Sequence, residues 1–242
     1  INTFDDAVNA VLSGQTSFTI STTQSPDGEI GGHIAQLAPA ITTNLHKVFA
    51  YGVRNTFGYD FDPVTGRLWL EEDGDQSFDK ISVVDAGANN GWIQSSAPLV
   101  QFDGSLDPGA LAEFKSIELK RSPNGMQQRR WPTANIPDTP EQALNQMVML
   151  PGAHYNPSVF SARAEIPPAG LGFLNSSALG PQYQNALFEG EARDNFPGSP
   201  FRDPREQFDG ALFVFHPNDD RSGLDFGGDP NIRSTDGVFM NN

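Results

Sequence analysis

The sequence contains no cysteine, which excludes disulfide bonds, zinc–thiolate sites and cysteine nucleophiles together. Basic residues are also scarce, because 15 Lys and Arg stand against 30 Asp and Glu, for a formal net charge of −15 at pH 7. Such a charge repels nucleic acid and anionic lipid, and it attracts cations. No apolar run approaches the roughly 18 residues that cross a bilayer. We therefore expect neither a nucleic-acid partner nor a membrane span.

Turn-forming and aromatic residues are abundant in place of long periodic segments. The 242 residues include 24 Gly, 19 Pro and 18 Phe. Gly and Pro at this frequency break helices and favour many short elements joined by turns. The composition therefore indicates an all-β fold, and the length allows one domain or two.

Short β-rich runs bounded by turn residues recur along the chain. Residues 59–62 and 67–70 flank Pro63-Val-Thr-Gly66, where Pro fixes an early φ and Gly permits a positive one, which predicts a β-hairpin. Further strands are predicted at residues 48–53, 81–84, 169–174, 185–189 and 210–216, and short helices at residues 5–12 and 141–149. Prolines spaced through residues 95–150 indicate an irregular excursion from the sheets.

One continuous segment carries a family signature. Residues 49–92 contain Ala-Tyr-Gly-Val-Arg-Asn, Phe-Asp-Pro-Val-Thr-Gly-Arg-Leu-Trp, Glu-Asp-Gly-Asp and Gly-Ala-Asn-Asn-Gly-Trp in that order. This order resembles PQQ-dependent glucose/sorbosone (aldose sugar) dehydrogenases, and a weaker likeness continues through residues 155–224. The resemblance implies a six-bladed β-propeller, of which this chain is the later half with about three to four blades. Residues 1–242 would then form one partial propeller domain with an irregular insertion at about 95–150.

The resemblance also implies a cofactor site. Arg54 and Asn55 correspond to a pair that contacts PQQ, and Arg193 falls where the family has a basic residue at the cofactor's rim. Gly74 and Asp75 correspond to the loop whose main-chain carbonyls bind calcium. Two structural alternatives stay open: Arg54 braces loop carbonyls, and the acidic loop is merely solvated. The loop also departs from the family pattern, with Asp73 for Asn, Asp75 for Pro and Lys80 for an acidic residue.

The family's catalytic base, a His in an Asp-His motif, has no counterpart here. His33 lies where the pattern predicts a structural strand, and the other histidines show no metal spacing or paired nucleophile: His46, His154 and His216. Trp69 and Trp92 are interpreted as packing anchors. Asn175-Ser-Ser177 meets the glycosylation sequon, which also occurs by chance.

Two functions from different classes follow from these residues. The first is a quinoprotein oxidoreductase that oxidises a small sugar by hydride transfer to PQQ with calcium, in the periplasm or outside the cell. The second is a catalytically inactive propeller of the same lineage that serves as a binding or assembly module. Because a half-ring would expose two apolar blade faces, we expect a further segment, a second chain or a second copy to complete the propeller.

Overall fold

The computed structural model describes residues 16–20, 30–34, 47–74, 78–92, 94–101, 104–121, 135–162, 168–191 and 211–227. The chain divides into two compact units, Ile1–Val48 and Phe49–Asn242. In the first unit, β1 (Thr16–Ile20) pairs antiparallel with β2 (Ile30–Ile34). His33 lies in β2, as predicted, with Ser17 as its partner in the register. The helix predicted at residues 5–12 lies outside the described residues.

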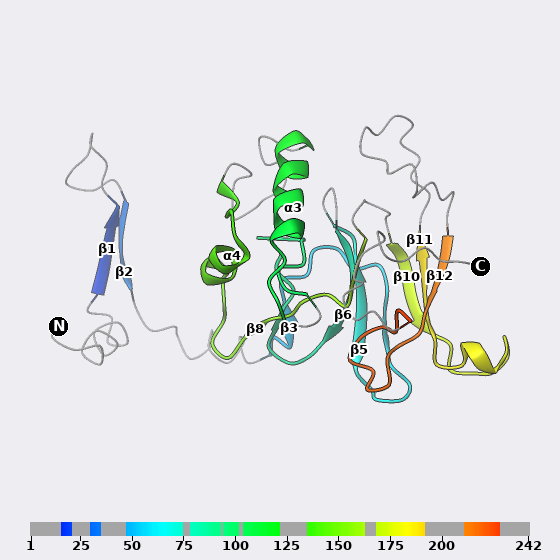
Figure 1. Ribbon diagram of the computed structural model, residues 1–242. Coiled ribbons are helices and arrows are strands. Elements are labelled where there is room, and N and C mark those ends of the chain that lie inside the picture. Colours follow the sequence, from blue (N-terminus) through cyan, green and yellow to red (C-terminus); the bar gives the residue numbers. More distant parts are fainter. Residues whose placement is uncertain are drawn as a thin grey trace. The chain divides into compact units, whose positions relative to one another are not determined.

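A four-stranded antiparallel sheet forms the middle of the second unit (Figure 1). Its order is β4 (Tyr59–Phe61), β5 (Leu68–Glu72), β6 (Asp79–Val84) and β9 (Phe160–Ala162). The predicted hairpin is confirmed, since β4 and β5 pair and the Asp62 carbonyl accepts the Gly66 N–H at 2.8 Å. Gly66 has φ 72°, a conformation that glycine adopts without strain.

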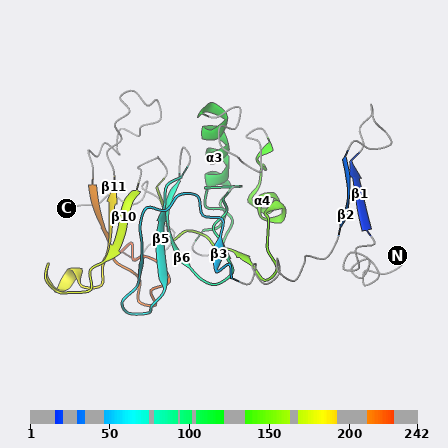
Figure 2. The same cartoon turned by 180° about the vertical axis from the view of Figure 1, so that it is seen from behind.

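A three-stranded antiparallel sheet packs beside the first, as both views show (Figures 1 and 2). It consists of β10 (Pro168–Phe173), β11 (Leu187–Glu191) and β12 (Ala211–Phe215). The predicted anchor Trp69 is 0% exposed between the sheets and meets Phe173 edge to face at 5.6 Å. Gly58 allows the close approach, because a Cβ at that position would lie 2.1 Å from the Leu171 nitrogen.

Two helices occur in the described part of the excursion between residues 95 and 150. The predicted helix is present as α4 (Pro140–Gln146), with the Thr139 hydroxyl as its N-cap. The longer α3 (Pro108–Arg121) was not predicted, although Asp107 caps it by accepting the Ala110 N–H at 2.9 Å and Pro108 suits its first turn. Both helices contribute to a second apolar cluster, which includes Leu111, Phe114, Ala143 and Met147.

One small sheet is parallel, unlike the two larger sheets of this unit. β3 (Ala50–Tyr51), β7 (Ala88–Asn89) and β8 (His154–Tyr155) pair in parallel, but each strand has only two residues. The short 3-10 helix η2 (Pro181–Tyr183) precedes β11. The described part of the chain is therefore mostly β-sheet with few helices, as predicted, whereas blade number and ring closure stay predictions. No helix in these described segments combines the length and apolar character needed to cross a membrane.

Candidate functional site

A polar network surrounds the point where β5 ends. Glu71 and Glu72, the last two residues of β5, are 0% and 1% exposed. Successive strand residues point to opposite faces, so the two carboxylates enter different surroundings. Each therefore has its own partners and its own ionisation behaviour.

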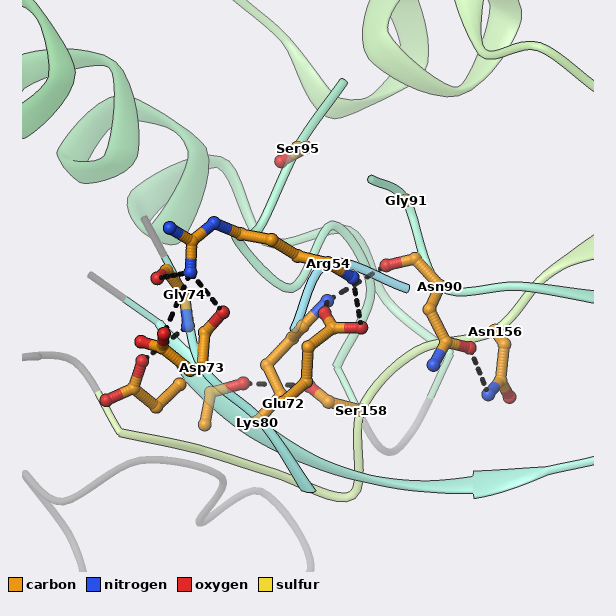
Figure 3. A network of polar contacts seen from close by, with 12 residues as sticks. Arg54, Glu72, Asp73, Gly74, Lys80, Asn90, Gly91, Ser95, Asn156 and Ser158 are labelled. Atoms are coloured by element: carbon orange, nitrogen blue, oxygen red, sulfur yellow. Dashed lines mark hydrogen bonds and ion pairs between the residues drawn. The ribbon is translucent and has the colours of Figure 1, made fainter. Parts of the chain in front are cut away.

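Glu72 forms a buried ion pair with Lys80, its cross-strand partner on β6 (Figure 3). The Lys80 Nζ lies 2.6 Å from Glu72 Oε1 and donates to the Asn90 carbonyl at 2.9 Å. The second Glu72 oxygen accepts the Arg54 backbone N–H at 3.0 Å. Lys80, which departs from the family pattern, is thus explained by the register that places it opposite a buried carboxylate.

Glu71 faces the second sheet and has fewer partners. Its Oε1 accepts the Phe57 N–H at 3.1 Å, whereas its Oε2 is buried without a hydrogen-bond partner among the described residues. Burial raises the pKa of Glu71 to about 7. Burial, and then the charges of Glu71 and Asp79, raise the pKa of Glu189 on β11 well above its usual value. These two carboxyl groups therefore favour the protonated form.

Arg54 extends to the segment that follows β5 (Figure 3). Its Nη1 donates to the Asp73 carbonyl at 2.7 Å, to Asp73 Oδ2 at 3.0 Å and to the Gly74 carbonyl. The guanidinium carbon lies 5.6 Å from the centroid of the Trp92 ring, a cation–π distance. The side chains of Arg54 and Asp73 are 14% and 16% exposed, so solvent still reaches this pair.

Asn55 reaches the same carboxylate. Its Nδ2 donates to Asp73 Oδ2 at 3.0 Å, and its carbonyl accepts the Asp73 N–H at 2.8 Å. The structure therefore brings together three predicted residues, Arg54, Asn55 and Gly74, around Asp73. Arg193 and Asp75, the other two predicted site residues, lie outside the described residues.

The Gly87–Trp92 turn closes the network from the other side. The Asn90 side chain accepts the Asn156 Nδ2–H at 2.9 Å, and its own Nδ2 is buried without a partner in the described segments. Gly52 lies against this turn, because a Cβ there would lie 2.2 Å from Asn89 Oδ1. Asn90 and Asn156 were not predicted as site residues, although the Asn-Asn pair of the signature was the available signal.

The remaining predicted residues lie apart from this network. His154 and His216 are exposed at a strand and a strand end, and Asn175 of the sequon is exposed. His46 lies outside the described residues. No group of three or more His, Asp or Glu side chains that could hold a metal ion occurs in the described part of the chain.

Sequence comparison finds relatives of one segment of the chain. Residues 27–110 match the family described as Glucose / Sorbosone dehydrogenase, which confirms the resemblance found at residues 49–92. An uncharacterized protein of Synechocystis is 38% identical over 56 residues, which cover 23% of this chain and 12% of that protein. The weaker likeness at residues 155–224 lies outside the family match and stays a prediction.

Two solved structures align with 60% of the chain. The soluble aldose sugar dehydrogenase of Escherichia coli in its apo-form is 23% identical, with a TM-score of 0.33 and 30% of its chain covered. A glucose dehydrogenase is 20% identical, with a TM-score of 0.34 and 31% of its chain covered. The alignments thus span less than a third of either solved chain, and the likeness to the family rests on residues 27–110.

Proposed function

Residues 27–110 match the glucose/sorbosone dehydrogenase family, and from that premise we propose that this chain is part of a quinoprotein oxidoreductase acting on a small sugar. Bound PQQ would supply the hydride acceptor for oxidation of a sugar hydroxyl group. The observation that carries the proposal is the convergence of Arg54 and Asn55 on one partly exposed carboxylate, that of Asp73.

The donors of Arg54 and Asn55 suit an anionic ligand. A guanidinium and a primary amide both donate to carboxylates, and charge-assisted bonds of this kind are the stronger ones. Asp73 now accepts from both side chains, so it stands in for a ligand carboxylate and competes with one. Trp92 lies against the Arg54 guanidinium and limits its movement.

This proposal is tested by titrating PQQ into the purified chain and following the quenching of tryptophan fluorescence. Arg54→Gln should weaken binding by about tenfold or more, because it removes a charge-assisted donor. Asp73→Asn should strengthen binding, because it removes the competing anion. Arg67→Gln removes the same charge at an exposed turn and should leave binding unchanged. Equal binding by wild type and Arg54→Gln would contradict the assigned role of Arg54.

A specific observation favours the second candidate, a non-catalytic module of the same lineage. Arg54 donates to the main-chain carbonyls of Asp73 and Gly74, which is the bracing role that the sequence left open. In that case the wild-type chain should bind no PQQ, and Arg54→Gln should affect only stability. The same titration therefore separates the two functions.

Completion of the propeller by further sequence or by a second copy is also part of the proposal. It is supported by an exposed aromatic row at alternate positions, where Phe57, Tyr59 and Phe61 are 63%, 67% and 58% exposed. The 242-residue chain alone should then reduce no redox dye with glucose and PQQ, whereas a longer product that carries the family's His should. Turnover by the monomeric chain would contradict this. We propose a periplasmic or extracellular location on the family likeness alone.

A further inference from the structure

The oxygen atoms around Arg54 Nη1 outnumber its hydrogens. Three oxygens lie within hydrogen-bonding distance of this one nitrogen: the Asp73 carbonyl at 2.7 Å, Asp73 Oδ2 at 3.0 Å and the Gly74 carbonyl. A guanidinium Nη carries two hydrogens, so the three acceptors share two donors. An arrangement of oxygens converging on one point is the arrangement that surrounds a bound cation.

Calcium prefers such a set of carboxylate and main-chain oxygens, at about 2.3 to 2.6 Å. Here the position at the centre of the three oxygens belongs to a guanidinium nitrogen with a full positive charge. A metal ion could take these oxygens only by displacing Arg54 or by lying beside a like charge. Gly74, whose carbonyl the family resemblance assigns to calcium, is therefore already bound to a cation of the chain itself.

Arg54 is held in this position from several directions. Its backbone N–H donates to Glu72 at 3.0 Å, and its guanidinium lies over Trp92. The nearby carboxylates are also engaged, since Glu72 pairs with Lys80 and Asp79 accepts the Gly74 N–H at 2.6 Å. Lys80 adds a second buried cation where the family has an acidic residue. The described part of the loop therefore does not fit calcium.

We propose that the Arg54 guanidinium is the resident cation of the Asp73–Gly74 segment and that this segment binds no calcium while Arg54 is present. The family resemblance implies an arginine and calcium side by side; here the guanidinium itself lies among the Asp73 and Gly74 oxygens, and any anionic ligand of this site binds without calcium. The proposal is independent of PQQ binding, because it concerns only the loop oxygens and the cation among them.

Calcium titration of the purified chain tests this proposal. By isothermal titration calorimetry, Arg54→Gln should gain a calcium site with a dissociation constant of about 1 mM or tighter, at least tenfold tighter than wild type. Arg67→Gln is the matched control, because it makes the same change to the net charge of −15 without touching the loop, and it should behave as wild type. A gain common to both variants would reflect diffuse acidity and would overturn the proposal.

Terbium, a luminescent substitute for calcium, locates the new site. Because Trp92 lies against the guanidinium, terbium bound in Arg54→Gln should be excited through this tryptophan, and adding Trp92→Phe should remove most of that emission. Arg54→Lys keeps a cation and should stay free of calcium, which preserves the test if Arg54→Gln fails to fold by circular dichroism. Calcium binding by wild type as tight as by Arg54→Gln, with the same sensitised emission, would overturn the proposal.

Discussion

The two ends of strand β5 carry the same pair of residue types in different surroundings. Before β5, Arg221 Nε donates to Asp62 Oδ2 at 2.6 Å, with side chains 13% and 0% exposed. After β5, Arg54 Nη1 donates to Asp73 Oδ2 at 3.0 Å, with side chains 14% and 16% exposed. Both arginines also lie over an aromatic ring, Phe173 and Trp92, at 5.4 and 5.6 Å. Burial of the carboxylate is therefore what separates the two pairs.

The pair before β5 has complementary donors and acceptors. Asp62 also accepts the Val64 N–H and the Thr65 hydroxyl, and Arg221 donates to the Asn185 carbonyl. Arg221 adopts φ 55°, a left-handed conformation that costs a non-glycine residue about 1 kcal/mol. Because the backbone keeps this conformation, the contacts of the Arg221 side chain outweigh the strain. This pair joins the β4–β5 turn to the loop after β12, and its role is stability.

The pair after β5 has more acceptors than donors and stays open to solvent. The Asp73 carboxylate accepts hydrogen bonds from both Arg54 and Asn55, and the Asp73 carbonyl also accepts from Arg54 Nη1. Such a pair contributes less to stability and can exchange partners. The pair before β5 thus suits a structural role, whereas the pair after β5 suits the ligand recognition that we propose for it.

The largest predicted effect is a difference in the free energy of unfolding between variants of Asp62 and Asp73. Asp62→Ala should lower the free energy of unfolding by about 4 kcal/mol, because it removes a fully buried carboxylate together with the bonds it accepts from Arg221 and from the turn. Asp73→Ala should lower it by about 1 kcal/mol or less, since that pair is partly solvated. Urea unfolding of both variants measures the difference, with the exposed Asp85→Asn as control. Similar losses at Asp62 and Asp73 would show that burial of the carboxylate does not distinguish the two ion pairs.

The second effect concerns Glu71, beside the open pair. Its pKa of about 7 exceeds the ordinary 4.5, so protonated Glu71 favours the folded state below pH 4.5, and that stability is lost as the pH rises through about 7. A shift of this size corresponds to roughly 3 kcal/mol. Glu71→Gln, which stays neutral, should therefore match wild type at pH 4.5 and exceed it at pH 8 in urea unfolding. An unchanged pH profile in this variant would show that Glu71 is ionised without penalty.

Local chemistry explains what the sequence could predict. The Asp62–Gly66 turn follows from Pro and Gly at fixed positions, and the burial of Trp69 follows from a β-rich strand in the family signature. The proximity of Arg54, Asn55 and Gly74 came from the resemblance, which groups residues by position without giving their contacts. That Arg54 is bound to the Gly74 carbonyl required the structure.

Long-range pairing explains what it could not predict. Asp62 and Arg221 lie 159 residues apart, and no periodicity relates them. The ion pair of Glu72 and Lys80 depends on the β5–β6 register. That register could not be predicted, because the loop between the two strands departs from the family pattern. Helix α3 was missed because Pro108 and Gly109 suggested a break, whereas Asp107 and Pro108 form its start. Clusters of Pro and Gly thus mark helix beginnings as well as loops.

The smallest predicted effect is on stability at acid pH, and it concerns Asp62. Hydrogen bonds from Arg221, Thr65 and Val64 outweigh burial and lower the pKa of Asp62 below its ordinary 3.8. A lowered acid pKa stabilises the folded state above pH 3.8, and that stability is lost as the pH falls through the folded value. Asp62→Asn should therefore lose less stability than wild type as the pH falls below about 4, because the amide cannot take up the proton. Urea unfolding across that range measures it, with Asp73→Asn as the matched variant for the open pair. If Asp62→Asn left the acid limb unchanged, Arg221 and the turn donors would not favour the ionised Asp62 carboxylate, and the structural role assigned to this pair would be wrong.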